Sequence, residues 1–166
     1  WAIQLYEIIE KYANDKVYKG YIEAFNKDWS PIEDMRLSEK DENEAKTMNT
    51  HLHILEAYTN LLQIYKNEGL KNNLEKLTQL FLAKFINSKN HTNLFFDEKW
   101  NINGDLVSYG HDIETAWLLI EAAKETKNKK LVSETKRKAV LIADTFLKEG
   151  VDDDGGVIYE YFPSKK

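Results

Sequence analysis

Apolar residues recur every three or four positions along most of this chain, which is the spacing of one face of an α-helix. The pattern predicts helices over residues 1–13, 42–67, 70–85, 111–126 and 130–147. The first is expected to be the tail of a helix, because no Ser, Thr, Asp or Asn precedes Trp1 as an N-cap. Gly20, Trp29 and Pro31 predict an extended segment and loop over residues 15–35.

Two short β-prone stretches separate the second and third of the longer helices. The strands expected there, Asn93–Phe96 and Leu106–Tyr109, flank Asn103-Gly104, a favoured turn pair for a hairpin. Glu68-Gly69 is expected to end the helix of residues 42–67, since glycine is the usual left-handed residue after a helix.

The elements follow the order helix, helix, hairpin-like loop, and this order occurs twice. Gly150 is expected to end the last helix, with a turn at Asp154-Gly155-Gly156 before a strand over Val157–Tyr161. Short linkers within each pair favour antiparallel helices. We therefore predict an all-α fold, a single domain over residues 1–166 that forms an arc of an α/α toroid or solenoid. A site is expected among the long loops at one end.

Composition narrows the function classes. The chain has 166 residues, of which 42% are hydrophobic and 31% charged, as in an ordinary soluble domain. The formal charge of −5 argues against nucleic acid or an anionic membrane as a partner. With no cysteine, disulfides and thiolate sites are excluded. Because the chain opens at Trp1 without an initiator methionine, we expect an internal piece of a longer protein.

Two of the four histidines lie in the cluster Asn49-Thr50-His51-Leu52-His53. Helical spacing puts Asn49, His53 and Glu56 on one side of the helix. His51 is about 200° from His53 around the axis and points elsewhere. The cluster is either part of a site or simply one hydrogen-bonded core histidine and one surface histidine.

The second cluster centres on His111, followed by Glu114 and Trp117 at helical spacing. Glu114 can hold the imidazole of His111 and fix its tautomer. A helix that starts near Gly110 puts His111 at the positive end of the dipole, which favours a neutral ring able to accept a proton. Trp117 offers a stacking surface for a sugar. The set suits proton abstraction beside a carbonyl; the alternative is an ordinary helix start.

Other polar features are expected to be structural. His-x-His with His-x-x-Glu contains metal-binding residue types, but the spacing matches neither HExxH nor a zinc finger, so we expect no metal. The run Asp152-Asp153-Asp154 lacks the ligand spacing of an EF-hand and is expected to be a solvated turn. His91 is expected to be a loop residue. Four aromatic residues either line a sugar cleft or fill a core: Tyr18, Tyr21, Phe25 and Trp29.

Three blocks of the sequence resemble consecutive blocks of the cellobiose 2-epimerases, part of the N-acylglucosamine 2-epimerase superfamily. They are KTMNTHLHILEAYTNL (Lys46–Leu61, within the stretch Arg36–Tyr58), SYGHDIETAWLLIEAA (Ser108–Ala123) and the weaker DGGVIYE (Asp154–Glu160). In a minor departure, Lys19 precedes Gly20 where relatives often have a Gly-Gly pair.

The resemblance implies an (α/α)6 barrel and reversible inversion at C2 of a reducing-end sugar, such as cellobiose to glucosylmannose, without a cofactor. A histidine removes the C2 proton, an enediolate forms, and a second histidine returns a proton to the opposite face. Carried over by position, the catalytic residues are His111, Glu114 and His53. The substrate-binding residues are Asn49, Trp117 and His51, and the individual role of His51 stays open.

The resemblance also places essential groups outside this chain. A stabilising arginine is expected before Trp1, and the partner histidine, with another Trp and Glu, after Lys166. We therefore expect a cytoplasmic epimerase fragment that is inactive alone. Its expected partners are a small sugar (a disaccharide or hexosamine) and a second copy that covers apolar helix faces. Neither nucleic acid nor a membrane is expected.

Four other functions compete with this interpretation. Two of them use the same scaffold: an aldose–ketose isomerase and an N-acylglucosamine 2-epimerase. A glycoside hydrolase would need two placed carboxylates, whereas the clusters here centre on histidine. The last rival is a carbohydrate-binding or purely structural unit.

Overall fold

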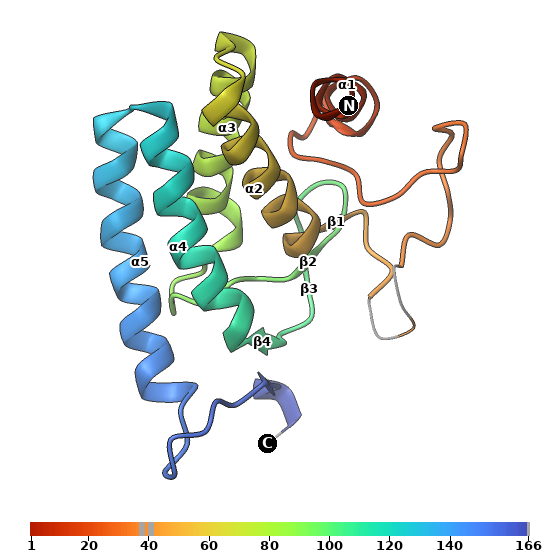
Figure 1. Cartoon of the computed structure of the whole chain (residues 1–166). Coiled ribbons are helices and arrows are strands. Elements are labelled where there is room, and N and C mark those ends of the chain that lie inside the picture. Colours follow the sequence, from red (N-terminus) through yellow and green to blue (C-terminus); the bar gives the residue numbers. More distant parts are fainter. Residues whose placement is uncertain (37–38, 40–41, 166) are drawn as a thin grey trace.

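Two antiparallel helix pairs form the body of the chain in the computed structural model (Figure 1). The first pair is α2 (Met48–Ile64) and α3 (Glu68–Leu80), and the second is α4 (Tyr109–Thr126) and α5 (Lys129–Glu149). The two helices of each pair pack side by side and are joined by a linker of only a few residues, which confirms the predicted antiparallel arrangement. The all-α class predicted from the spacing of apolar residues is also confirmed.

The structure describes residues 1–36, 39 and 42–165. Four residues of the stretch that carries the family resemblance, Leu37, Ser38, Lys40 and Asp41, lie outside the described residues, as does Lys166. Among the helices that are described, none is both long enough and apolar enough to cross a membrane.

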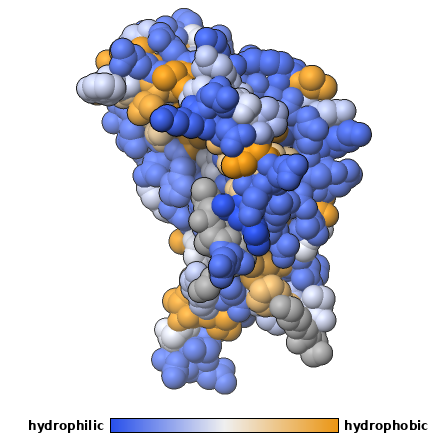
Figure 2. Space-filling model, turned by 90° about the vertical axis from the view of Figure 1, so that its right-hand side faces the viewer, coloured by the Kyte–Doolittle hydropathy of each residue, from blue (hydrophilic) through white to orange (hydrophobic). Residues whose placement is uncertain are grey.

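A shorter helix, α1 (Ala2–Ile8), lies beside the end of α2 and α3 and continues as the π-helical turn η1 (Ile9–Ala13). This agrees with the helix predicted for residues 1–13. The helix predicted for residues 70–85 likewise ends in a π-helical turn, η2 (Phe81–Phe85). Figure 2 looks at the side of the molecule where α1 lies and shows apolar surface among hydrophilic side chains.

The helix predicted over residues 42–67 begins later than expected, at Met48. Lys46 and Thr47 form strand β1, which pairs antiparallel with β2 (Phe95–Phe96). The Thr47 side chain then caps α2 by accepting a hydrogen bond from the Thr50 N–H at 3.1 Å. The prediction was wrong for residues 42–47 because a strand partner so distant in sequence leaves no trace in the local spacing of apolar residues.

Gly69 does not end the first long helix, contrary to prediction, but lies inside the first turn of α3. The linker is instead formed around Tyr65, the C-cap of α2, and Asn67, the N-cap of α3. The Asn67 side chain accepts a hydrogen bond from the Leu70 N–H at 2.9 Å. Asparagine is among the strongest N-cap residues, and here it decides the boundary against the glycine that follows.

The short strands form two small antiparallel sheets at the end where α2 and α4 begin (Figure 1). One has the order β1-β2-β3, with β3 at Ile102–Asn103, and the other pairs β4 (Val107–Ser108) with β5 (Glu160–Tyr161). The hairpin expected about Asn103-Gly104 is therefore wrong, since Asn103 is a strand residue and β4 pairs elsewhere. The strand predicted near the C-terminal end is confirmed at Glu160–Tyr161. A 3-10 turn, η3 (Pro163–Lys165), follows it.

Four hairpin turns among the described residues share one geometry. In each, the N–H of an Asn or Asp donates to the carbonyl four residues on, and its own carbonyl accepts from the N–H three residues on. The turns begin at Asn26, Asn87, Asp97 and Asp152. The residue three positions later has a positive φ in every case: Trp29 (68°), Asn90 (66°), Trp100 (72°) and Gly155 (87°). This is a tight turn followed by one left-handed residue, and the predicted turn at Asp154-Gly155-Gly156 is confirmed.

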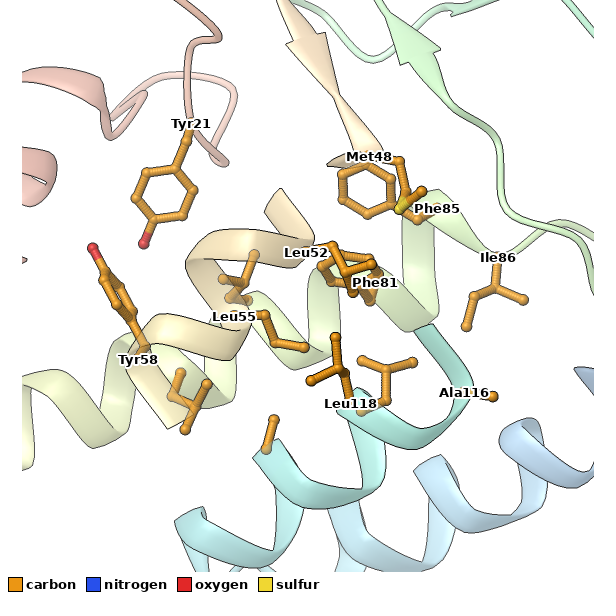
Figure 3. Packing of buried hydrophobic residues seen from close by; sticks show 14 of the residues in the cluster. Tyr21, Met48, Leu52, Leu55, Tyr58, Phe81, Phe85, Ile86, Ala116 and Leu118 are labelled. Carbon is orange, nitrogen blue, oxygen red and sulfur yellow. The ribbon is translucent and has the colours of Figure 1, made fainter. Parts of the chain in front are cut away.

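The core lies between α2, α3 and α4 (Figure 3). Leu52 and Leu55 of α2 point toward Phe81 at the end of α3 and Leu118 of α4, and all four side chains are buried. Because α3 packs against both α2 and α4, the exposed faces of α2 and α4 look away from α3, toward the same side of the molecule. This shared exposed side, which carries His53 on α2 and Trp117 on α4, is called the open face below.

Candidate functional site

Asn49, His53 and Glu56 occupy one side of the first turns of α2, as their spacing predicted. The His53 side chain is 62% exposed, and its Nδ1 lies 3.8 Å from Glu56 Oε2. Asn49 and Glu56 are half-buried. His53 is therefore accessible on the open face.

His51 lies on the opposite side of α2, fully buried in the core. Its Nε2 accepts a hydrogen bond from the Tyr21 backbone N–H at 2.9 Å. That nitrogen must therefore be unprotonated, so in the neutral ring Nδ1 carries the proton and donates to the Thr47 carbonyl at 2.6 Å. The structure thus separates the two histidines, and His51, with both ring nitrogens engaged, is not brought to the open face with His53.

The surroundings of His51 favour its neutral form. Burial, helped by the nearby positive charge of Lys46 and opposed by the hydrogen bond to the Thr47 carbonyl, lowers the pKa of the ring to about 4. The rings of Phe85, Trp100 and Tyr21 surround the imidazole at centroid distances of 4.9, 5.6 and 5.7 Å. His51 is a neutral hydrogen-bonding group under ordinary conditions.

His111 lies in the first turn of α4, at the positive end of the helix dipole, as predicted. Its ring is half-buried, and Nδ1 lies 2.9 Å from the hydroxyl oxygen of Ser108. Within the described part of the chain, Nε2 of this ring has no hydrogen-bond partner. One nitrogen is thus held by the protein while the other is available for proton transfer.

Glu114 and Trp117 follow His111 along α4. The expected contact between Glu114 and the imidazole is wrong, because among the described residues no hydrogen bond or ion pair joins them and Ser108 takes that place. Glu114 is half-buried, whereas Trp117 is 51% exposed. An indole exposed to this extent offers an apolar ring face to solvent at the open face.

A buried pair beneath His111 was missed by the sequence analysis. Asp112, the next residue, is 1% exposed, and its Oδ2 lies 2.7 Å from Nδ1 of His91. Its other oxygen accepts hydrogen bonds from the backbone N–H and the hydroxyl of Thr92, each at 2.7 Å. His91 is a loop residue, as predicted, but it is buried rather than solvated. No sequence signal pairs it with Asp112.

Lys46 is a second buried group that spacing did not reveal. Its ammonium group lies 2.7 Å from Asp15 Oδ2 and donates to the Glu98 carbonyl at 2.7 Å. It also lies 4.7 Å from the centroid of the Trp100 ring, within range of a cation–π contact. Burial alone would raise the pKa of Asp15, but hydrogen bonds from Lys46 and the backbone hold it below its ordinary value. Lys46 thus fastens two loops to the start of α2.

The aromatic residues that sequence left open divide between core and surface. Tyr21 is buried, and its hydroxyl donates to Glu10 Oε1 at 2.7 Å, beside the Tyr58 hydroxyl at 2.8 Å from the same oxygen. Burial and the charge of Glu10 raise the pKa of Tyr21. Trp29 is 38% exposed and stacks on Tyr12 with ring centroids 4.7 Å apart. Tyr21 is therefore a core residue, and Trp29 belongs to the surface.

Two remaining features bear on bound groups. Among the described residues, no group of three or more His, Cys, Asp or Glu side chains is arranged to hold a metal ion. A cavity of about 450 Å³ lies between the loop that carries His91, the segment 103–107, and Tyr161 with Pro163. This cavity is not lined by the predicted site residues His53, His111 and Trp117.

Antiparallel helix pairs, with hairpins gathered at one end and histidines at the starts of two neighbouring helices, define this chain as part of an (α/α)6 barrel. The sequence model of the N-acylglucosamine 2-epimerase (GlcNAc 2-epimerase) family matches residues 1–166. The chain therefore belongs to the N-acylglucosamine 2-epimerase family.

Individual relatives agree with this assignment. The chain is 47% identical over 161 residues to the cellobiose 2-epimerase of Bacteroides fragilis, covering 96% of this chain and 41% of that protein. Its identity to the cellobiose 2-epimerase of Dictyoglomus turgidum is 41% over 152 residues, covering 91% and 39%. The solved structure of cellobiose 2-epimerase from Bacillus thermoamylovorans B4167 superposes with a TM-score of 0.90 at 38% identity, covering 97% and 41%. The chain thus spans about two fifths of the length of these relatives.

Proposed function

We propose that this chain is the middle part of a carbohydrate 2-epimerase that inverts C2 of the reducing-end glucose of cellobiose-like disaccharides. The matched relatives are cellobiose 2-epimerases, which supports this substrate class over N-acylhexosamines. In the open-chain sugar, the C2 proton is acidic because the carbonyl stabilises the enediolate that its removal creates. Return of a proton to the opposite face of C2 gives the epimer.

The observation that carries the proposal is the state of His111. Its Nδ1 is held by Ser108 while Nε2 is available, half-buried at the positive end of α4. A base needs this combination, because one nitrogen must be fixed for the other to meet a particular proton. When Nδ1 carries a proton and donates it to the Ser108 hydroxyl, Nε2 holds the lone pair that accepts the C2 proton.

The other candidate residues take supporting roles in this proposal. Trp117 stacks on the apolar face of a sugar ring, for which its exposed indole is suited. His53 and Asn49 on α2 bind sugar hydroxyls and assist ring opening, and Glu114 contributes a carboxylate next to the site. For His51 we replace the predicted sugar contact with a positioning role, because both its ring nitrogens already hold the loop before α2 and the start of that helix.

The test uses a chimaera in which this chain replaces the matching segment of the Bacteroides fragilis enzyme, since 41% of that protein aligns with it. Incubation with cellobiose in D2O is expected to give glucosylmannose with deuterium at C2. A ketose product labelled at C1 would show an aldose–ketose isomerase, and turnover of N-acetylglucosamine alone an N-acylglucosamine epimerase. A folded chimaera without turnover, or a His111→Asn variant with undiminished turnover, would refute the proposed mechanism.

Location and self-association remain separate proposals. Several apolar side chains are exposed on the helices, among them Leu5 (57%), Ile64 (84%) and Leu147 (67%), and we propose that a second copy covers part of this surface. The cytoplasm stays a sequence-based prediction for the site of action, which fractionation of cells expressing the tagged protein would test.

A further inference from the structure

The carboxylate of Asp112 is the most tightly held side chain in the first turn of α4. Three donors converge on it at 2.7 Å each: the His91 ring, the Thr92 N–H and the Thr92 hydroxyl. All three come from the loop that follows η2. A buried carboxylate with this many donors has one stable position, so it fixes the rotation of the helix turn that carries it.

His111 is carried by the same turn. It precedes Asp112 directly, and its own ring reaches back to Ser108 at the end of β4. A rotation or slide of this turn would therefore displace the ring together with the carboxylate. General bases are sensitive to such displacement, since about 1 Å can change a rate by roughly 100-fold.

The far side of His91 meets the end of α5. Its Nε2 lies 3.2 Å from Oε2 of Glu149, the last residue of that helix. The next residue, Gly150, packs so closely on the Tyr109 ring that an added Cβ would lie 2.8 Å from Cδ1. His91 therefore connects the start of α4 to the end of α5.

We propose that His91, which bridges Asp112 and Glu149, is a positioning residue for His111 through its hydrogen bond to Asp112. This inference rests on the proposed function, because it assumes that His111 transfers the proton. His91 itself is 4% exposed and lines the cavity beside Tyr161 rather than the open face. It acts through Asp112, because its hydrogen bond fixes this carboxylate and the carboxylate fixes the first turn of α4.

The bridge requires a charged ring. Carboxylates are acceptors only, so both nitrogens of His91 must carry protons to satisfy Asp112 and Glu149 together. The hydrogen bond to Asp112, with further support from Glu149, raises the pKa of His91 against the effect of burial. The Tyr109 ring also lies near the imidazole, with ring centroids 5.8 Å apart. The ammonium group of Lys138 donates a hydrogen bond to the side chain of Asn90, the residue before His91.

Three substitutions in the chimaera separate the contact of His91 with Asp112 from its contact with Glu149. His91→Ala removes both contacts. His91→Asn keeps an amide donor near the position of Nδ1 and loses only the link to Glu149, and Glu149→Gln weakens that link alone. A matched control is Thr78→Val, which removes an equally buried hydroxyl on α3 that bonds the Leu74 carbonyl.

His91→Ala is expected to lower kcat by roughly 10- to 100-fold while KM for cellobiose stays within about twofold. His91→Asn is expected to recover most of kcat, and Glu149→Gln and Thr78→Val to stay near the unsubstituted chimaera. Circular dichroism and thermal unfolding give the folded fraction used to correct each rate.

Two outcomes would overturn the positioning role. One is a corrected kcat for His91→Ala equal to that of Thr78→Val, and the other is no recovery in the folded His91→Asn variant. Failure of the proposed function is recognised separately. If His111→Asn keeps full turnover, the base has been misassigned; if His111→Asn is inactive and His91→Ala is not, only the present inference fails.

Discussion

His51 and Tyr21 are joined by a hydrogen bond in which the imidazole Nε2 accepts the backbone N–H of the tyrosine over 2.9 Å. The bond links the first turns of α2 to a loop thirty residues earlier. Because a backbone N–H can only donate, protonation of this ring would break the contact and bury a charge. The relationship therefore predicts how stability responds to acid.

Stability should fall as the pH drops from about 6.5 to about 4. The folded state holds the pKa of His51 at about 4, below its ordinary value of 6.5, so the unfolded chain binds this proton first. The stabilising effect is complete above 6.5 and lost on the way down to 4. This lowering of the pKa of His51 corresponds to about 3 kcal/mol of unfolding free energy.

Chemical denaturation across this pH window measures the loss, and NMR titration of the His51 ring assigns it. His53→Ala serves as the control, because its ring is 62% exposed and it should leave the acid-induced loss in place. A folded-state pKa for His51 near 6.5 would contradict the prediction. His91 contributes in another window: its raised pKa stabilises the fold below about 6.5 and this effect is lost as the pH rises through the raised value.

The buried ion pair between Lys46 and Asp15 should show strong coupling. Their side chains are 0% and 7% exposed, so removal of either partner leaves a charge with little water around it. Asp15→Asn or Lys46→Met is expected to cost about 3 to 5 kcal/mol. The double variant should cost less than the two together, with a coupling energy of about 1 to 3 kcal/mol. Urea unfolding of all four proteins completes the cycle, and strictly additive costs would refute it.

Replacement of Lys19 by glycine is expected to stabilise the chain. Lys19 has a φ of +69°, which residues other than Gly, Asn or Asp adopt at a cost in free energy. Lys19→Gly should therefore stabilise the chain by about 1 kcal/mol, which gives a physical reason for the Gly-Gly pair expected from the family resemblance. Lys16→Gly, in the same loop but without a positive φ, is the matched control and should destabilise. Equal effects of the two substitutions in thermal unfolding would count against this explanation.

The 166-residue chain by itself should show no appreciable epimerase activity. It spans about two fifths of the length of its relatives, and the second acid/base histidine expected from the resemblance lies outside it. Incubation with cellobiose followed by chromatography of the sugars checks this, with the chimaera as the positive control. Glucosylmannose formed by the isolated chain would contradict the prediction. Calorimetry with cellobiose tests separately whether the chain binds sugar without turnover.

Self-association is expected at high concentration. Light scattering across a concentration series should show a rising mean mass, because exposed apolar side chains such as Ile64 and Leu147 gain from being covered. Ile64→Lys, which adds a charge to an 84% exposed position, should weaken association without unfolding the chain. A constant monomer mass at high concentration would rule the proposal out.

Sequence spacing was sufficient to find the four longer helices, though not all of their ends, because each buries residues at a spacing of three or four. It also placed His111 in the first turn of α4, since the block from Ser108 to Glu114 carries local signals for a helix start. For the His51–His53 pair, spacing established opposite faces of α2 but not which face is buried. That depends on Tyr21 and Trp100, which come from loops distant in sequence.

The remaining features depend on partners that local patterns do not specify. β1 replaces helix at Lys46–Thr47 because β2 supplies hydrogen bonds from a distant segment. His91 becomes a buried bridging group because Asp112 and Glu149 converge on it from two different helices. Family resemblance did not supply these contacts either, because the motifs name single residues rather than their buried neighbours.

The four hairpin turns have a consequence for how this molecule can change over time. Each satisfies its own backbone groups between an Asn or Asp and the residues three and four positions on. Trp29 and Trp100 occupy the same left-handed position in two of these turns. Because each turn satisfies its own backbone groups, exposed residues at its tip that contact no other loop can be exchanged without disturbing the turn. Trp100 is not such a residue, since its Nε1 donates to the Tyr18 carbonyl of another loop at 2.7 Å. Selection can therefore alter such exposed positions one turn at a time while the helices beneath stay the same.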